Sequence, residues 1–303
     1  MARLFVNQLT VIDCAYLDHH RGVVGESWIV DIELAGALDE QGMVFDFGHV
    51  KKRIKHIIDT EVDHRLLVPM AMKDCKIPFD GKTLSIEFPL ANDGVIRHQS
   101  PHSAVLLMNS ESIDIKSIAS HLQSKVKQRL PNNISDVVIK LRTEAIDGAY
   151  YHYTHGLQQH QGHCQRIAHG HRSRLEIEID GQRQTQLETQ WALLLKDSYI
   201  ATNSHIIETL DHNHISHTRL AYIAQQGGFS ITLPTRQVFN IPTVSTVENI
   251  AAYLAEMIAK EHRGKVVVRA FEGVEKGAIG EAFGEGDIFT NTANQGQHCR
   301  LAF

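Results

Sequence analysis

The chain has 303 residues, of which 43% are hydrophobic and 21% are charged. This composition is that of a globular protein and excludes a disordered or collagenous chain, and the length suffices for about two average domains. The formal net charge of −5 argues against a general nucleic-acid binder, and no apolar run approaches the ~18–20 residues that span a bilayer. Neither nucleic acid nor a membrane is therefore expected as a partner.

In the first half, alternating apolar and polar residues predict strands over 4–17 and 26–35, and apolar residues at helical spacing predict helices over 50–62 and 118–126. A strand at 137–141 follows. In the second half, strands are expected at 151–157, 175–179 and 265–271, and helices at 206–210 and 247–258. Each half thus has the order strand, strand, helix, helix, strand, with a short closing strand. This order predicts an α+β fold with an antiparallel sheet in each half.

The two halves also share motifs in the same order. Segments 24–36 and 169–181 both have Gly as their second residue, alternate apolar and polar residues and end at Gly. Further along, Asp63-His64 matches Asp211-His212, and Glu144 matches Glu272. The spacing of these matches predicts an insertion in the first half, at about residues 76–101. A tandem duplication is indicated, with domains at 1–148 and 149–303 that pack together.

The cysteines and histidines indicate what kind of site to expect. The four cysteines lie far apart and form no C-x-x-C pair, which argues against a disulfide framework: Cys14, Cys75, Cys164 and Cys299. The first residues lack the apolar segment of a secretory signal, so a cytoplasmic location is expected. Histidine is unusually frequent, with 20 in the chain, which favours a metal site.

The strongest chemical signal is His169-Gly170-His171, with His155 upstream. Residues two apart on a strand project to the same face, about 6.5–7 Å apart, so both imidazoles could bind one ion. His155 ends the preceding predicted strand and could supply a third nitrogen. Three histidines without a fourth protein ligand are typical of catalytic zinc, which keeps one position open. The alternative is a chance motif in a histidine-rich chain.

Cys164 lies in the loop before these histidines, where a metal and imidazoles could lower the pKa of its thiol and make it a base or nucleophile. An inert buried cysteine is the alternative. The pairs Asp63-His64 and Asp211-His212 each follow a predicted helix. A carboxylate beside an imidazole suits a proton relay, although a histidine there is often only a helix cap.

Glu144 and Glu272 close a predicted strand in each half. A carboxylate at such a strand end could accept two hydrogen bonds from the N–C–NH2 edge of a heterocycle. A solvated surface charge is the alternative.

Together, these residues resemble the 6-pyruvoyl-tetrahydropterin synthase / 6-carboxytetrahydropterin synthase family, whose members share the tunnelling fold. The resemblance covers nearly all of the second half and rests on an ordered series: His155, Cys164, His169-Gly170-His171, Asp211-His212, the segment Ser245-Thr246-Val247-Glu248-Asn249, and Glu272. It implies two tunnelling-fold units, each with a four-stranded antiparallel sheet and two helices packed on one face. It also implies a homo-oligomer.

The same resemblance implies roles for individual residues. His155, His169 and His171 would hold Zn²⁺, and Cys164 would be the general base. Asp211-His212 would be the proton relay, and Glu272 and Thr246 would contact a pterin. The implied substrate is 7,8-dihydroneopterin triphosphate, and the implied product is 6-carboxy-tetrahydropterin, a precursor of queuosine, or its 6-pyruvoyl counterpart.

The first half departs from this pattern. Val24-Gly25-Glu26 stands where the second half has its histidine motif, so one zinc ion per chain is expected. Family members form their sites between neighbouring units, so Asp63, His64 and Glu144 could complete the site of the second half; otherwise they are relics. Two other functions stay open: a catalytically lapsed pterin- or purine-binding protein of the same fold, and a zinc-storage protein using residues 152–171. A hydrolytic zinc enzyme is disfavoured because the chain has no HExxH motif.

Overall fold

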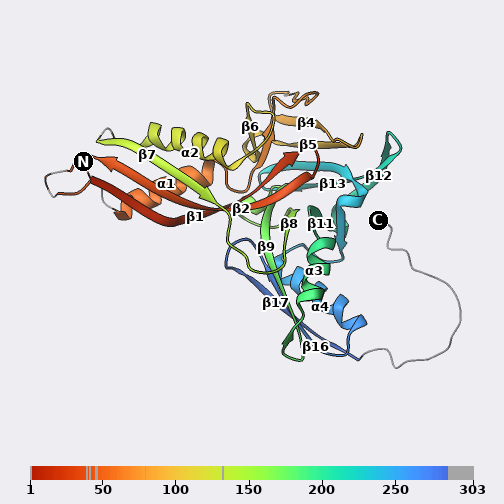
Figure 1. Cartoon of the computed structure of the whole chain (residues 1–303). Coiled ribbons are helices and arrows are strands. Elements are labelled where there is room, and N and C mark those ends of the chain that lie inside the picture. Colours follow the sequence, from red (N-terminus) through yellow and green to blue (C-terminus); the bar gives the residue numbers. More distant parts are fainter. Residues whose placement is uncertain are drawn as a thin grey trace, which may run out of the picture.

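The computed structural model describes residues 2–38, 40, 42–44, 47–78, 80–131 and 133–285. Within them, two similar α+β units follow one another and meet near the middle of the molecule (Figure 1). The first unit comprises β1 (Ala2–Asp18), β2 (Gly22–Gly36), α1 (Phe47–Glu61), β3 (Leu66–Pro69), β6 (Val105–Met108), α2 (Ile115–Arg129) and β7 (Ile134–Arg142). The second comprises β8 (Tyr150–His155), β9 (His169–Ile179), β10 (Gln182–Arg183), α3 (Thr185–Leu194), β11 (Ser198–Thr202), β15 (Val238–Ile241), α4 (Val247–Glu261), β16 (Gly264–Phe271) and β17 (Gly277–Gly284).

Each unit has one main sheet, and the two sheets have corresponding strand orders. The first order is β6-β3-β1-β2-β7, and the second is β15-β11-β8-β9-β16-β17, with β10 paired to β9. The pairs β1–β3, β3–β6, β8–β11 and β11–β15 are parallel, and the remaining pairs of these two sheets are antiparallel. The expectation of four-stranded antiparallel sheets is therefore wrong in detail. After the first helix of each unit, a short strand (β3 or β11) runs parallel to the first strand (β1 or β8). Two parallel strands need a long connection of this kind, and the helix provides it.

Most predicted helices are confirmed, and their ends follow from local chemistry. Asp114 caps α2 by accepting the backbone N–H groups of Lys116 and Ser117. The Thr246 hydroxyl caps α4 by accepting the N–H of Asn249. The apolar faces of α1 and α2 pack on the first main sheet, and α4 packs on the second, so each unit has its own core.

The expected helix at 206–210 is wrong. These residues belong to strand β12 (Ile206–His212), which forms a hairpin with β13 (Ile215–Ala224) and leaves the Ile207 side chain exposed. The first helix of the second unit is instead α3. Its pattern is hard to recognise because it buries only Ala192 and the charged Glu188, which pairs with Arg183, while Leu193 is exposed.

Both units carry an insertion, not only the first. Residues 76–101 of the first unit contain β4 (Thr83–Pro89) and β5 (Val95–Pro101), which confirms the insertion predicted there. The second unit inserts β12, β13 and β14 (Gly227–Pro234). Strands β14 and β5 pair, so the two insertions form one third sheet of order β12-β13-β14-β5-β4. This sheet packs against residues of both units and joins them through a shared core.

The two units approach most closely where their motifs each have a glycine. A Cβ atom on Gly25 would lie 1.8 Å from the carbonyl oxygen of Tyr153, and one on Gly170 would lie 2.7 Å from the Cα of Gly25. No side chain fits there, so the glycines shared by the two repeats are required for the backbones of β2 and β9 to pass each other.

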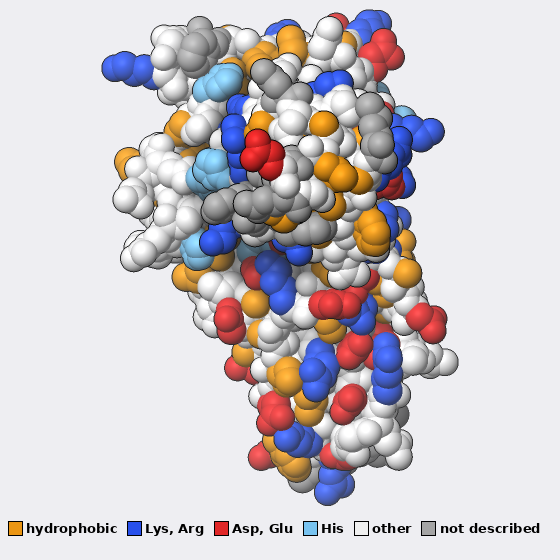
Figure 2. Space-filling model, turned by 90° about the vertical axis from the view of Figure 1, so that its left-hand side faces the viewer, with side chains coloured by type: hydrophobic (Ala, Val, Ile, Leu, Met, Phe, Trp, Pro, Cys, Tyr) orange, Lys and Arg blue, Asp and Glu red, His pale blue; other side chains and the backbone are white. Residues whose placement is uncertain are grey.

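The surface carries charges of both signs. On the face shown in Figure 2, acidic and basic side chains are interspersed over the lower half of the view. Among the described residues, no helix is long and apolar enough to cross a membrane.

Candidate active site

Three buried histidines converge where the second unit meets the first. His155 ends β8 and pairs with His169 at the start of β9, and His171 follows two residues later on the same face. Their exposed fractions are 0–1%. One ligand atom from each ring lies within 4.8 Å of the others, and the Nε2 atoms of His155 and His171 are 3.2 Å apart.

The Nδ1 atom of each ring faces another group. His155 Nδ1 lies 2.7 Å from the Ser245 carbonyl oxygen, and His169 Nδ1 lies 3.0 Å from that of Arg166. His171 Nδ1 lies 3.2 Å from the carboxylate of Asp13. All three rings therefore keep Nε2 for a common ligand, and the buried Nε2 atom of His169 has no hydrogen-bond partner.

The donor set fits a tetrahedral metal ion with one open position. Two nitrogens bonded to zinc at ~2.0–2.1 Å in tetrahedral geometry are about 3.3 Å apart, close to the 3.2 Å between His155 and His171 Nε2. Burial is the main cause that lowers the pKa of His155 to about 3 and that of His169 well below its usual value, with smaller contributions from neighbouring histidines. Both rings are therefore neutral, as metal ligation requires.

Asp13 comes from β1 of the first unit and is 3% exposed. Burial alone would raise the pKa of this carboxyl, but His171, Lys276 and a 2.6 Å hydrogen bond from the Ser27 hydroxyl hold it well below its usual value. An ionised carboxylate behind a metal-binding histidine orients the ring and raises its basicity. The first unit thus supports the three histidines of the second, which are here called the metal cluster because together they could hold one ion.

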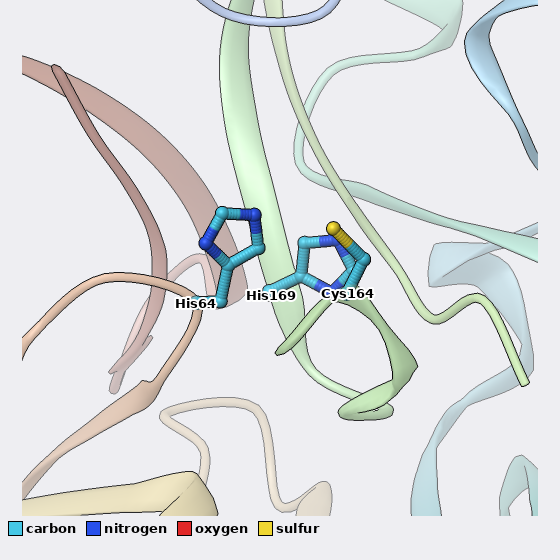
Figure 3. A group of neighbouring side chains, drawn as sticks. All are labelled: His64, Cys164 and His169. Carbon is cyan, nitrogen blue, oxygen red and sulfur yellow. The ribbon is translucent and has the colours of Figure 1, made fainter. Parts of the chain in front are cut away.

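Asp63 and His64, between α1 and β3 of the first unit, lie beside the same cluster. The rings of His64 and His169 have centroids 5.1 Å apart, and His64, Cys164 and His169 come together from three separate segments (Figure 3). His64 Nδ1 lies 2.7 Å from Asp63 Oδ2, which leaves Nε2 for the Cys164 thiol. Burial alone would lower the pKa of His64, but its hydrogen bonds to Asp63 and Cys164 outweigh burial and raise the pKa to about 10.

The structure does not bring Asp211 and His212 to this cluster. They lie on β12, an edge strand of the third sheet, where Asp211 accepts the backbone N–H of His214 and His212 contacts the ring of His217. The residue that matches His64 by fold is Asp197, as described below.

Glu272 and Thr246 are linked to the metal cluster through neighbouring residues, whereas Glu144 pairs with an arginine of β9. Lys276 links Glu272, at 3.8 Å, to Asp13, at 3.3 Å. Thr246 follows Ser245, the hydrogen-bond partner of His155, and its own hydroxyl is used in capping α4. Glu144 forms a 2.7 Å ion pair with Arg174.

The described cysteines form no disulfide. Cys14 is buried in the core of the first unit and Cys75 is half-buried, whereas Cys164 lies in the cluster. Cys299 lies outside the described residues.

The strand register identifies the counterpart of the metal cluster in the first unit. Tyr16 pairs with Val24 as His155 pairs with His169, and Cys14 pairs with Glu26 as Tyr153 pairs with His171. The three histidines therefore correspond to Tyr16, Val24 and Glu26.

His64 likewise has a counterpart in the second unit. Leu66 pairs with Ala15, and Tyr199 pairs with Thr154, so the residues two positions earlier, His64 and Asp197, are equivalent. Both have a left-handed backbone, with φ of 54° and 55°.

Beside Asp197 and Tyr16, the counterparts of His64 and His155, lies the positively charged guanidinium group of Arg21. Arg21, from the short turn between β1 and β2, donates two hydrogen bonds to Asp197, of 3.0 and 2.5 Å, and one of 3.0 Å to the Tyr16 hydroxyl. A valine and a carboxylate replace two imidazoles, so the first unit has no three-histidine position.

No sequence motif marks Asp13, Ser27 or Arg21 as residues of the site. Asp13 and Ser27 pair across β1 and β2, as His152 and Arg172 pair across β8 and β9. The roles of these three residues become visible only when the two repeats are placed together, because each one contacts a residue of the second unit: His171, Arg172 or Asp197.

A family model described as 6-pyruvoyl tetrahydropterin synthase matches the chain twice, over residues 14–142 and 146–279. A protein of Pyrococcus horikoshii named "Putative 6-carboxy-5,6,7,8-tetrahydropterin synthase" is 22% identical over 130 residues, which is 43% of this chain and 74% of that protein. A protein of Pyrococcus abyssi with the same name has the same identity and coverage.

Two solved structures are also similar. The 6-pyruvoyltetrahydropterin synthase of Plasmodium vivax aligns with a TM-score of 0.36 and 16% identity, and that of Plasmodium falciparum with 0.36 and 13%. Each alignment covers 46% of this chain and 97% of the other chain. By its two family-model matches, which together span most of its length, the chain belongs to the 6-pyruvoyl tetrahydropterin synthase family and carries that family's unit in tandem.

Proposed function

We propose that the protein is a zinc-dependent lyase that acts on 7,8-dihydroneopterin triphosphate and yields 6-carboxy-tetrahydropterin or its 6-pyruvoyl counterpart. The observation that carries this proposal is the contact between the two units: Asp63 and His64 of the first adjoin Cys164 and the three histidines of the second. One complete set of groups per chain is thereby formed from two incomplete repeats.

The protein groups are suited to moving protons. Cys164 is the proposed base that takes a proton from a carbon of the substrate side chain. His64, whose raised pKa keeps the ring protonated at neutral pH, gives its Nε2 proton to the substrate and regains one from Cys164, while the Asp63 carboxylate stabilises the protonated ring through Nδ1. We propose that His155, His169 and His171 hold the ion through Nε2, and that Asp13 orients His171 from behind. When bound, zinc would polarise the side-chain oxygens of the substrate and acidify the adjacent C–H bonds.

Glu272 is the proposed anchor for the pterin ring. It stands beside Lys276 at the end of β16, and its carboxylate could accept hydrogen bonds from the N–C–NH2 edge of the ring. Thr246 is a neighbour of the metal cluster, and we propose that it contacts the pterin through its backbone, since its hydroxyl caps α4.

We also propose that several chains assemble. Strand β17 ends its sheet and exposes Ile279 and Phe283, at 52% and 73%. Among the described residues no further strand pairs with β17, and exposed apolar side chains on such a strand favour contact with another chain. Light scattering at several protein concentrations tests this, and a monomer at all of them would contradict it.

The direct test is to incubate the zinc-loaded protein with 7,8-dihydroneopterin triphosphate and to identify products by mass spectrometry, with metal analysis alongside. We expect triphosphate release and a tetrahydropterin product, lost in Cys164→Ala and kept in Cys75→Ala, whose thiol lies outside the cluster. Triphosphate release that survives Cys164→Ala would overturn the mechanism. Tight pterin binding without any product would identify the alternative, a lapsed pterin-binding protein, which the divergence of the first unit favours.

A further inference from the structure

His169 belongs to two groups of potential metal ligands. In the first, it joins His155 and His171, the three-histidine position described above. In the second, it joins His64 and Cys164, and the ligand atoms of these three residues also lie within 4.8 Å of one another. We propose that this second group, here called the thiolate position, is an alternative binding position for a soft metal ion such as Cd²⁺, and that occupying it inhibits the enzyme.

The ring geometry decides which atoms form the thiolate position. His64 Nδ1 is held by Asp63, and His169 Nδ1 is held by the Arg166 carbonyl group. Both imidazoles therefore present Nε2, and Cys164 adds its Sγ atom from the loop between β8 and β9 (Figure 3). The Nε2 atom of His169 is buried without a partner, so it can bind an ion in either position but not in both at once. One ion per chain occupies one position or the other.

The two positions differ in chemistry. The three-histidine position offers only imidazole nitrogens, whereas the thiolate position combines two nitrogens with sulfur. Thiolate ligands select soft ions, so Cd²⁺ or Cu⁺ should favour the thiolate position more than Zn²⁺ does. On binding, the metal–sulfur and metal–nitrogen bonds replace the protons held by Cys164 Sγ and His64 Nε2, and these protons pass to the buffer.

The inhibitory part of this inference rests on the proposed function. An ion in the thiolate position occupies the sulfur of Cys164 and the Nε2 of His64, which are the proposed base and its relay. It also removes His169 from the three-histidine position. Both effects stop turnover, whereas binding itself requires no substrate.

The test is a titration of the metal-free full-length protein with Cd²⁺, followed by the ultraviolet thiolate-to-cadmium charge-transfer absorption. We expect a saturable band in the wild type and in Cys75→Ser, the matched thiol control. The band should disappear in Cys164→Ser, and His64→Ala should weaken Cd²⁺ binding at least tenfold. His171→Ala removes a ligand of the three-histidine position only and should keep the band. Zn²⁺ added first should suppress it, because zinc takes the shared imidazole.

A full band in Cys164→Ser, or unchanged Cd²⁺ affinity in His64→Ala, would overturn the thiolate position. Circular dichroism of each variant shows whether it is folded, and two ligand variants keep the test valid if one fails to fold. The outcomes separate this inference from the proposed function. A protein that gives the predicted band but turns over no pterin loses only the proposed function, and one that turns over pterin without the band loses only this inference.

Discussion

The Nδ1 atom of His171, in the second unit, lies 3.2 Å from the Oδ1 atom of Asp13, in the first. This contact links the metal cluster of one repeat to a carboxylate of the other. Ser27 donates a hydrogen bond to the same Asp13 oxygen and accepts one from the backbone N–H of Arg172. The first unit therefore contributes to the candidate site, although Tyr16, Val24 and Glu26 stand at its own positions equivalent to the three histidines.

Asp13→Asn should weaken metal binding about 10–100-fold, because removing a carboxylate behind a ligand histidine costs affinity on that order. Competition with a chromophoric chelator measures this. Asp59→Asn is a matched control, since the Asp59 carboxylate pairs with Lys55 of the same helix, α1. Equal metal affinity in wild type and Asp13→Asn would show that Asp13 does not support His171.

His64→Ala should lower the turnover rate by about 10²–10⁴-fold, the usual contribution of a general acid–base group, while metal content stays at one ion per chain. The matched control is His212→Ala, which changes a histidine of the β12–β13 hairpin. Steady-state kinetics, with metal analysis of each variant, shows whether Asp63-His64 or Asp211-His212 is the proton relay. If His212→Ala abolished turnover and His64→Ala did not, the relay would be Asp211-His212, as the sequence resemblance implied.

Glu26→Gln should change the pH dependence of stability. Burial raises the pKa of Glu26 from 4.5 to about 7, despite the backbone N–H of Ser27, which lowers it. Between these values the unfolded chain releases the proton and the folded chain keeps it, so stability falls as the pH rises from about 4.5 to about 7. Glutamine has no such proton, so above pH 7 the variant should be the more stable protein by up to about 3 kcal/mol.

Urea unfolding at about pH 4 and pH 8 checks this prediction. The difference between wild type and Glu26→Gln should be small at the lower pH and appear only at the higher one. Glu33→Gln, at a more exposed position of the same strand, is the control and should change in the opposite sense, because Lys140 and Arg3 lower the pKa of Glu33. A difference that is the same at both pH values would contradict the raised pKa.

Arg21→Met should destabilise the fold by about 2 kcal/mol, because it leaves the mostly buried carboxylate of Asp197 without its two hydrogen bonds. The double variant Arg21→Met/Asp197→Asn should recover part of this loss. The exposed pair Arg3 and Glu33 provides the comparison, where Arg3→Met should cost less than about 1 kcal/mol. Additive effects of Arg21→Met and Asp197→Asn would mean that the pair is not coupled.

Much of the fold could be read from hydrophobic periodicity. The long alternating segments became β1, β2 and β9, and the stripes at 50–62, 118–126 and 247–258 became α1, α2 and α4. Periodicity failed at 206–210 because Ile206, Ile207 and Leu210 fit helical spacing, while pairing with β13 made the segment a strand. It missed α3 because that helix buries an ion-paired glutamate.

The sequence by itself determined the tandem repeat and the histidine motif, because alternation along a strand already places His169 and His171 on one face. The division into domains at residues 148 and 149 stays a prediction. Only the tertiary structure decided which Asp-His pair stands by Cys164, because that contact joins residues of different units. The tertiary structure also decided that Arg21 pairs with Asp197, the counterpart of His64. The guanidinium group lies in a turn of the first unit and reaches Asp197 only when the two sheets are packed.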